Sequence, residues 1–125
     1  MWHTTASPNI RHRCEHGSIV AELSGEIDIV AGPGIGIVLD DLTRSWYSLL
    51  AVDLRPVTFM DSTALHLLLR ARTRVLQRQG VLRVVSTRPL LPRILVATGL
   101  EEHFPLHRSI DDTGPFTAAH RSQAD

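Results

Sequence analysis

Two stretches of the chain repeat apolar residues every three or four positions, which is the period of one face of a helix. The first of these faces consists of Ile35, Val38, Leu39, Leu42 and Trp46. The second belongs to a segment that begins at Asp61 and runs to about Gln79. Its inner face consists of Leu65, Leu68, Leu69, Val75 and Leu76. Gly80 follows it and suits the end of a helix, because glycine readily adopts the left-handed conformation found there. The pattern therefore predicts two amphipathic helices.

Shorter apolar runs that lack this period predict strands. They cover residues 10–14, 18–23, 49–54, 81–86 and 104–107. Residues 25–28 predict a turn before the first helix, and residues 57–60 a short connector before the second. A short helix is expected between Pro89 and Gly99, and a last one over residues 110–120.

The resulting order of elements is β-β-α-β-α-β-α-β-α, which predicts an α/β domain with a mixed, mostly parallel central sheet and helices packed on it. A length of 125 residues fits a single domain. Residues 1–9 are polar and without period, so we expect a flexible leader there. The domain is then expected over residues 10–120, followed by a polar tail over residues 121–125.

Composition narrows the range of functions. The 13 basic and 13 acidic residues balance, whereas a general binder of nucleic acid or of anionic membranes carries a basic excess. Cys14 is the single cysteine, so no internal disulfide forms, as suits a reducing cytosol. The chain shows no signal peptide and no apolar stretch near the ~20 residues that span a bilayer. We therefore expect a cytoplasmic protein that binds neither nucleic acid nor membrane.

The start of the long helix offers the clearest candidate chemistry, because Asp61, Ser62 and Thr63 stand together there. The first backbone N–H groups of a helix have no partner within it, and with the helix dipole they attract anions. A phosphate on Ser62 would bring about −2 charge beside Asp61, so a surface that binds a partner when neutral would repel it when phosphorylated. By itself the pattern favours the simpler interpretation that Asp61 or Ser62 caps the helix.

Several segments match, in order, the motifs of a known family. Asp61-Ser62-Thr63-Ala64-Leu65 corresponds to the signature Asp-Ser-[Ser/Thr]-Gly-Leu, and Gly25-Glu26-Ile27-Asp28 to the turn Gly-Glu-[Leu/Ile]-Asp. Residues 52–54, 57–60, 93–95 and 98–100 also fit the pattern. Over roughly residues 17–112 the chain thus resembles the STAS domain family, the fold of sulfate-transporter tails and anti-sigma-factor antagonists. One departure is Ala64, where the family usually has glycine.

The resemblance implies a non-catalytic switch without cofactor or metal. An antagonist of this family binds an anti-sigma factor, which is also an ATP-dependent serine kinase, and thereby frees a sigma factor. The kinase phosphorylates the serine that aligns with Ser62, the affinity falls, and a separate serine phosphatase restores it. By the same alignment Asp28, Asp61, Thr63 and Ala64 join Ser62 in the surface that meets the kinase. The protein is expected to be a monomer or a weak dimer.

Three other interpretations stay open. One is a STAS module that senses a ligand or serves as a scaffold in another signalling assembly. Another is a receiver-like phosphoacceptor at Asp53, at the end of a central strand, but a receiver needs an acidic pair for Mg²⁺ and a late lysine, which this sequence lacks. The third is a small flavodoxin-like enzyme, which would need converging acid, base or metal ligands that the sequence does not show.

Two weaker patterns predict local structure. Arg70, Arg74 and Arg78 recur every four residues and predict a solvated helix face, with partner contact near Arg70. Residues 32–36, Gly-Pro-Gly-Ile-Gly, predict a flexible loop. The reason is that each glycine weakens the start of a helix by about 1 kcal/mol relative to alanine.

Overall fold

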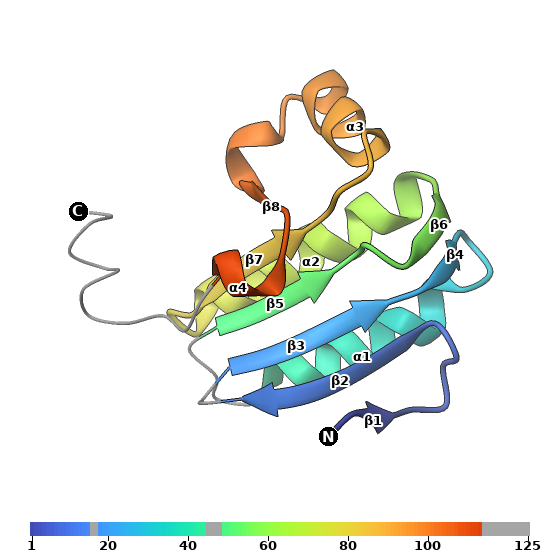
Figure 1. Ribbon diagram of the computed structural model, residues 1–125, viewed down its shortest axis with the longest axis vertical. Helices are drawn as coiled ribbons and strands as arrows, with labels where there is room; N and C mark the ends of the chain where they lie inside the picture. The colour runs from blue at the N-terminus through green and yellow to red at the C-terminus, as the bar shows by residue number, and fades with distance from the viewer. Residues whose placement is uncertain (16–17, 45–48, 114–125) are drawn as a thin grey trace.

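A six-stranded sheet forms the centre of the computed structural model, which describes residues 1–15, 18–44 and 49–113 (Figure 1). Its strands lie in the order β1 (His3–Thr4), β2 (Ile10–Glu15), β3 (Ser18–Leu23), β5 (Leu49–Asp53), β7 (Val81–Val85) and β8 (Leu106–His107). The strands β1, β2 and β3 pair antiparallel, whereas β3, β5, β7 and β8 run parallel. The expected α/β fold with a mixed, mostly parallel sheet is confirmed.

The N-terminal segment differs from the flexible leader expected over residues 1–9. His3 and Thr4 pair with β2 as an edge strand, and the Trp2 ring lies 4.0 Å from the Arg11 guanidinium carbon. A two-residue strand leaves no alternation for a sequence pattern to reveal. Its pairing therefore depends on contact with β2 rather than on any local signal.

A separate two-stranded sheet stands where the pattern predicts a turn and a connector. β4 (Gly25–Ile27) and β6 (Val57–Met60) pair in parallel, with Ile27 opposite Met60. Both of these side chains are buried in the hydrophobic core. The two segments are too short for their pattern to distinguish a strand from a loop. Their pairing brings the residues that follow each strand to one end of the molecule.

Two helices, α1 (Gly32–Arg44) and α2 (Ser62–Gln77), cover one face of the six-stranded sheet (Figure 1). As the helical period predicts, the buried residues include Ile35 and Leu39 of α1 and Leu65, Leu68 and Val75 of α2. Leu76 was also expected on the inner face, but its side chain is 47% exposed, because it lies at the flank of the apolar stripe. Trp46 lies outside the described residues.

The C-terminal third of the described chain adds α3 (Leu90–Thr98), the 3-10 turn η1 (Glu101–His103) and α4 (Ile110–Thr113). Leu91 and Leu95 of α3 join the core together with Phe104, and α4 lies against β5, β7 and β8. Residues 114–125, which hold the rest of the expected last helix and the expected tail, lie outside the described residues.

The glycines at the start of α1 allow two helices to pack closely. A Cβ atom on Gly32 would lie 2.5 Å from the Thr63 Cγ2 atom of α2, and one on Gly36 would lie 3.4 Å from Leu67 Cδ2. Because Gly32 and Gly36 are four residues apart, they share one face of α1. The flexible loop expected over residues 32–36 is therefore wrong, since this segment is helical and packs Gly32 and Gly36 against α2.

An ion cluster holds the other end of the same helix pair. The Arg70 guanidinium donates to both carboxylate oxygens of Asp40, at 2.8 and 2.9 Å, and Arg74 Nε donates to Thr43 Oγ1 at 2.8 Å. Hydrogen bonding from Arg70 lowers the pKa of Asp40. Arg70 and Arg78 are exposed, as expected for a solvated face, whereas Arg74 is only partly exposed and turns toward α1.

The end of α2 places an unusual residue in the left-handed conformation. Gln79 has φ of 61°, and the N–H groups of Gln79 and Gly80 donate to Leu76 and Val75 carbonyls, both at 2.9 Å. This pair of bonds forms a Schellman motif, whose left-handed position usually holds glycine. Gly80, which the sequence predicts as the helix terminator, therefore lies one residue after the left-handed position. In α3 the same role falls to Gly99, with φ of 71°.

Candidate functional site

The candidate site begins where β6 passes into α2. Asp61 is the N-cap of α2, and its Oδ1 atom accepts the Thr63 N–H at 2.8 Å. Hydrogen bonds from the Thr63 side chain and backbone hold the pKa of Asp61 below its usual value. Ser62 is the first helical residue and is exposed. The cap is thus supplied by Asp61, which leaves the Ser62 hydroxyl free of that role.

The two residues after Ser62 face inward. Thr63 is half-buried, and its methyl group lies against Gly32 of α1. Ala64 is 2% exposed and packs in the hydrophobic core. The direct partner contact expected at Ala64 is therefore not available on the surface, because the first turn of α2 points this position at the sheet. Of the two hydroxyls in the motif, only that of Ser62 belongs to an exposed residue.

Asp28 directly follows β4 and organises the start of α1. Its Oδ1 atom accepts the N–H groups of Val30 and Ala31, both at 3.0 Å, and its carbonyl accepts the Gly32 N–H at 2.8 Å. The cap or turn role that the sequence predicts for Asp28 is what these bonds provide. One carboxylate oxygen therefore holds the loop, and Oδ2 makes no hydrogen bond to the described residues.

Backbone contacts join the Asp28 loop to the start of α2. Ile27 and Met60 pair as the last residues of β4 and β6, and the Asp61 N–H donates to the Ile27 carbonyl at 3.3 Å. The contact between Gly32 and Thr63 adds a second connection. The fold thus places Asp28, Asp61, Ser62 and Thr63 at one end of the molecule, although more than thirty residues separate Asp28 from the others.

Large apolar side chains surround this end and were missed by the sequence interpretation. Ile29 is 78% exposed, Val30 is 84% exposed and Phe59 is 50% exposed. Such exposure of neighbouring apolar side chains marks surfaces that bind other proteins. The available signal was an apolar pair, Ile29 and Val30, placed directly after a capping aspartate where loops usually carry polar residues. The site therefore combines capping carboxylates, an exposed hydroxyl and apolar contacts.

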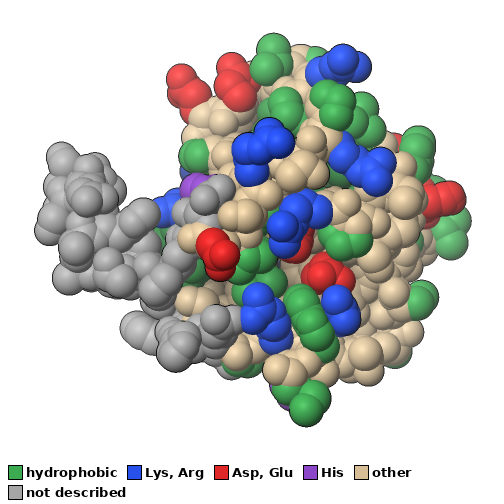
Figure 2. Space-filling model, viewed as in Figure 1, with side chains coloured by type: hydrophobic (Ala, Val, Ile, Leu, Met, Phe, Trp, Pro, Cys, Tyr) green, Lys and Arg blue, Asp and Glu red, His purple; other side chains and the backbone are tan. Residues whose placement is uncertain are grey.

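Asp53 lies on a different face and is already paired. Glu22 and Asp53 alternate with the core residues Ala21 and Val52, so they point away from α1 and α2. Asp53 is 3% exposed, and Arg55 donates to its two carboxylate oxygens at 3.0 and 2.9 Å. Figure 2 shows arginine and acidic side chains intermixed on this face. Asp53 therefore acts as a strand-end residue, and its carboxylate is occupied by Arg55.

Neither a metal site nor a membrane span emerges from the part of the chain that the structure describes. No group of three His, Cys, Asp or Glu side chains within residues 1–15, 18–44 and 49–113 is arranged to hold a metal ion. Within the same residues, no helix has the length and apolar character needed to cross a membrane.

The fold and the site define a small α/β domain in which an exposed serine opens a central helix beside a capped loop. The chain belongs to the STAS domain family, whose sequence model matches residues 7–113. This confirms the resemblance seen in the motifs. A search of proteins with curated functions found no match.

Several solved structures that are similar to this chain are described as anti-sigma factor antagonists. One from Mycobacterium paratuberculosis is 28% identical, with a TM-score of 0.75 over 86% of this chain and 94% of that chain. An anti-sigma-factor antagonist (STAS) domain protein from Planctomyces limnophilus is 21% identical, with a TM-score of 0.75 over 93% and 98% of the two chains. Unphosphorylated SpoIIAA is 16% identical, with a TM-score of 0.69 over 93% and 97%. The last two likenesses establish the fold alone.

Proposed function

We propose that this protein is a non-catalytic anti-sigma-factor antagonist whose binding to an anti-sigma factor is switched off by phosphorylation of Ser62. The observation that carries the proposal is the exposed Ser62 hydroxyl at the first position of α2, beside the Asp28 loop and exposed apolar side chains. The antagonist from Mycobacterium paratuberculosis, which aligns over most of both chains, supports it. In this role the protein acts in the cytoplasm, binds an anti-sigma factor that is also a serine kinase, and thereby frees a sigma factor.

The switch follows from the difference between a hydroxyl and a dianion in an interface. A hydroxyl is readily accommodated when a partner covers it, because one hydrogen bond replaces its water. A phosphate carries about −2 charge, and removing an ion from water costs several kcal/mol unless the partner pairs it. The nearby carboxylates of Asp28 and Asp61 add to the negative charge. Phosphorylated Ser62 therefore lowers the affinity, and a serine phosphatase restores it.

The same geometry selects Ser62 over its neighbour as the phosphoacceptor. Thr63 is half-buried, its methyl group meets Gly32 and its backbone N–H donates to Asp61 Oδ1 at 2.8 Å. A kinase must bring the γ-phosphate of ATP in line with the attacking oxygen, which requires an accessible hydroxyl. We expect a single phosphate on Ser62, and Thr63→Ser is the matched control, because it keeps a hydroxyl at the unmodified position.

The test uses purified protein, ATP and each anti-sigma kinase encoded in the same genome. Mass spectrometry should place one phosphate on Ser62, and Ser62→Ala should bind the kinase but remain unmodified. Titration calorimetry should show that the phosphorylated protein and Ser62→Glu bind at least tenfold more weakly, which corresponds to about 1.4 kcal/mol. The proposal fails if no kinase binds or modifies the protein, or if Ser62→Glu binds as tightly as the unaltered chain.

A further inference from the structure

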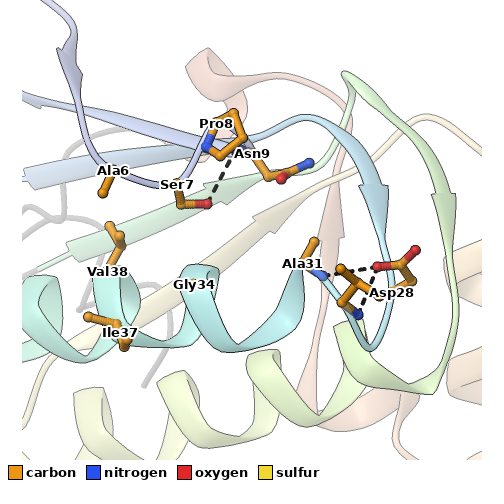
Figure 3. A pocket seen from close by; sticks show the side chains of 10 residues that line it. Ala6, Ser7, Pro8, Asn9, Asp28, Ala31, Gly34, Ile37 and Val38 are labelled. Carbon is orange, nitrogen blue, oxygen red and sulfur yellow. Dashed lines mark hydrogen bonds between the residues drawn. The ribbon is translucent and has the colours of Figure 1, made fainter.

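A groove lies between the N-terminal loop and α1, beside the proposed switch (Figure 3). Its volume is about 610 Å³. Ala6 and Pro8 form one wall, and Ile37 and Val38 of α1 form the other. Gly34 lies between them and leaves the floor without a side chain. The groove is therefore mostly apolar and open to solvent.

Hydrogen bonds hold the loop wall in place. Thr5 Oγ1 donates to the Ser7 carbonyl at 3.1 Å and accepts the Ser7 N–H at 3.2 Å. The Asn9 side chain donates to the Ser24 carbonyl at 2.8 Å, and the Asn9 carbonyl accepts the Ser24 N–H at 2.9 Å. The loop is thus attached to the end of β3, so the groove is a formed feature of the folded chain.

The helix side of the groove leaves large apolar groups in water. Ile37 is 66% exposed, and Val30, at the end of the groove nearest β4, is 84% exposed. Each exposed apolar side chain loses the roughly 1.5–3 kcal/mol that full burial would supply. Two such side chains beside a formed groove indicate a surface that another molecule covers.

Charge and continuity indicate what covers the groove. Asp28 lines it and is the only charged residue among the described residues that do so. Its Oδ1 atom is held by the Val30 and Ala31 N–H groups, which leaves Oδ2 for a partner. Asp28 also belongs to the end of the molecule that carries Ser62. A partner that reaches Ser62 and fills the groove therefore needs an apolar segment with a cationic side chain next to it.

We propose that the groove is a second docking point for the anti-sigma factor, and that it receives an apolar segment flanked by a Lys or Arg that pairs with Asp28. This inference rests on the proposed function. Phosphorylation leaves the groove residues unchanged, so the groove supplies affinity while Ser62 regulates it. The two parts together form one surface from Ala6 to the start of α2.

The test compares two variants that replace an apolar side chain by serine at positions with the same starting exposure. Ile37→Ser alters the groove, and Val96→Ser alters α3, where the side chain is also 66% exposed. The probe is the kinase that binds the unaltered chain in the preceding experiment. Ile37→Ser should raise its Kd at least tenfold, Val96→Ser should leave the Kd unchanged, and both variants should keep the thermal midpoint of the unaltered chain.

A third variant blocks the groove without removing an apolar group. A Cβ atom on Gly34 would lie 3.5 Å from the Ser7 Cβ and Oγ atoms, which is ordinary contact. Gly34→Leu should therefore fold, because leucine is a better helix former than glycine, and its longer side chain should fill the groove. We expect the Kd for the kinase to rise at least tenfold here as well.

The outcomes separate the groove from the switch. If the unaltered chain binds no kinase, both proposals fall. If Ile37→Ser and Gly34→Leu bind as tightly as the unaltered chain while Ser62→Glu does not, only the groove proposal falls. An equal loss of affinity in Val96→Ser would also overturn it. The groove proposal would also be overturned if a groove variant altered self-association in sedimentation experiments but not kinase binding. A second copy of this chain would then be the molecule that occupies the groove.

Discussion

The contact between Gly32 and Thr63 allows a sharp test of how the two helices at the site are held together. We predict that Gly32→Ala destabilises the fold. The added Cβ atom would lie 2.5 Å from Thr63 Cγ2, whereas two carbon atoms prefer about 3.5–4.0 Å. One helix must therefore move by about 1 Å, or Thr63 must leave its rotamer.

The size of the effect follows from two opposing terms. Overpacking of this kind costs about 1–3 kcal/mol, and alanine gains at most about 1 kcal/mol over glycine in a helix. The free energy of unfolding should thus fall by about 1–2 kcal/mol. Urea titration followed by circular dichroism measures it, with an unchanged slope showing that the unfolded state is the same.

Two further variants isolate the clash. Gly36→Ala is the matched control, because its Cβ atom would lie 3.4 Å from the mobile end of Leu67 and should leave stability unchanged or raise it by up to about 1 kcal/mol. Thr63→Ser removes the clashing methyl group, and the Thr63 Cβ atom lies 4.0 Å from where the added Cβ atom would stand. The double variant Gly32→Ala/Thr63→Ser should therefore recover most of the loss, with a coupling energy of about 1–3 kcal/mol.

Strict additivity would refute this reasoning. If the double variant lost the sum of the two single losses, the methyl group and the glycine would not be in contact. Equal destabilisation by Gly32→Ala and Gly36→Ala would likewise contradict the close approach at Gly32. The kinase affinity offers a second readout, because moving the start of α1 displaces Asp28 relative to Ser62.

Two other predictions concern stability away from the site. Gln79→Gly should raise the free energy of unfolding by about 0.5–1 kcal/mol in the same urea titration. A side chain at a φ of 61° costs about 1–2 kcal/mol, and part of this gain is lost because glycine makes the unfolded chain more flexible. An unchanged or lower free energy would show that the turn is not strained. Asp40→Asn should make the free energy of unfolding fall less steeply as the pH is lowered into the acid range. Arg70 lowers the pKa of Asp40 below its unfolded value of 3.8, so its contribution is present above that value and disappears as the pH falls through the folded pKa. Acid titrations of both chains check this, and parallel curves would contradict it.

Periodicity and motif order predicted the arrangement of the main elements. A helix that packs on a sheet must bury one apolar stripe, and the spacing of neighbouring residues in the sequence reveals that stripe. The inward-facing residues predicted in this way are Ile35, Leu39, Leu65 and Leu68. The position of Asp61 directly before a helix is also a local feature. Its capping role and the exposure of Ser62 therefore follow from neighbouring residues. Such features need no knowledge of distant contacts.

Features that depend on distant contacts were not predictable from local pattern. The glycines near Gly32 predict a break in the helix, whereas in the fold they allow α2 to pack against α1. The arginines near Arg70 predict a solvated face, whereas in the fold Arg70 pairs with Asp40. The groove and the exposed side chains of Ile29 and Phe59 emerge only when the N-terminal loop and β6 are positioned. In each case the deciding term is packing or charge pairing between elements far apart in the chain.

The short ladder between β4 and β6 has a kinetic consequence. Because Ile27 and Met60 are paired, the segments that carry Asp28 and Ser62 are ordered before any partner arrives. Association then loses little additional conformational entropy in these segments and need not wait for a rearrangement, so encounter rates of about 10⁵–10⁷ M⁻¹ s⁻¹ are within reach. Under the proposed function, the response time would then be determined by removal of the phosphate from Ser62 rather than by refolding of this chain.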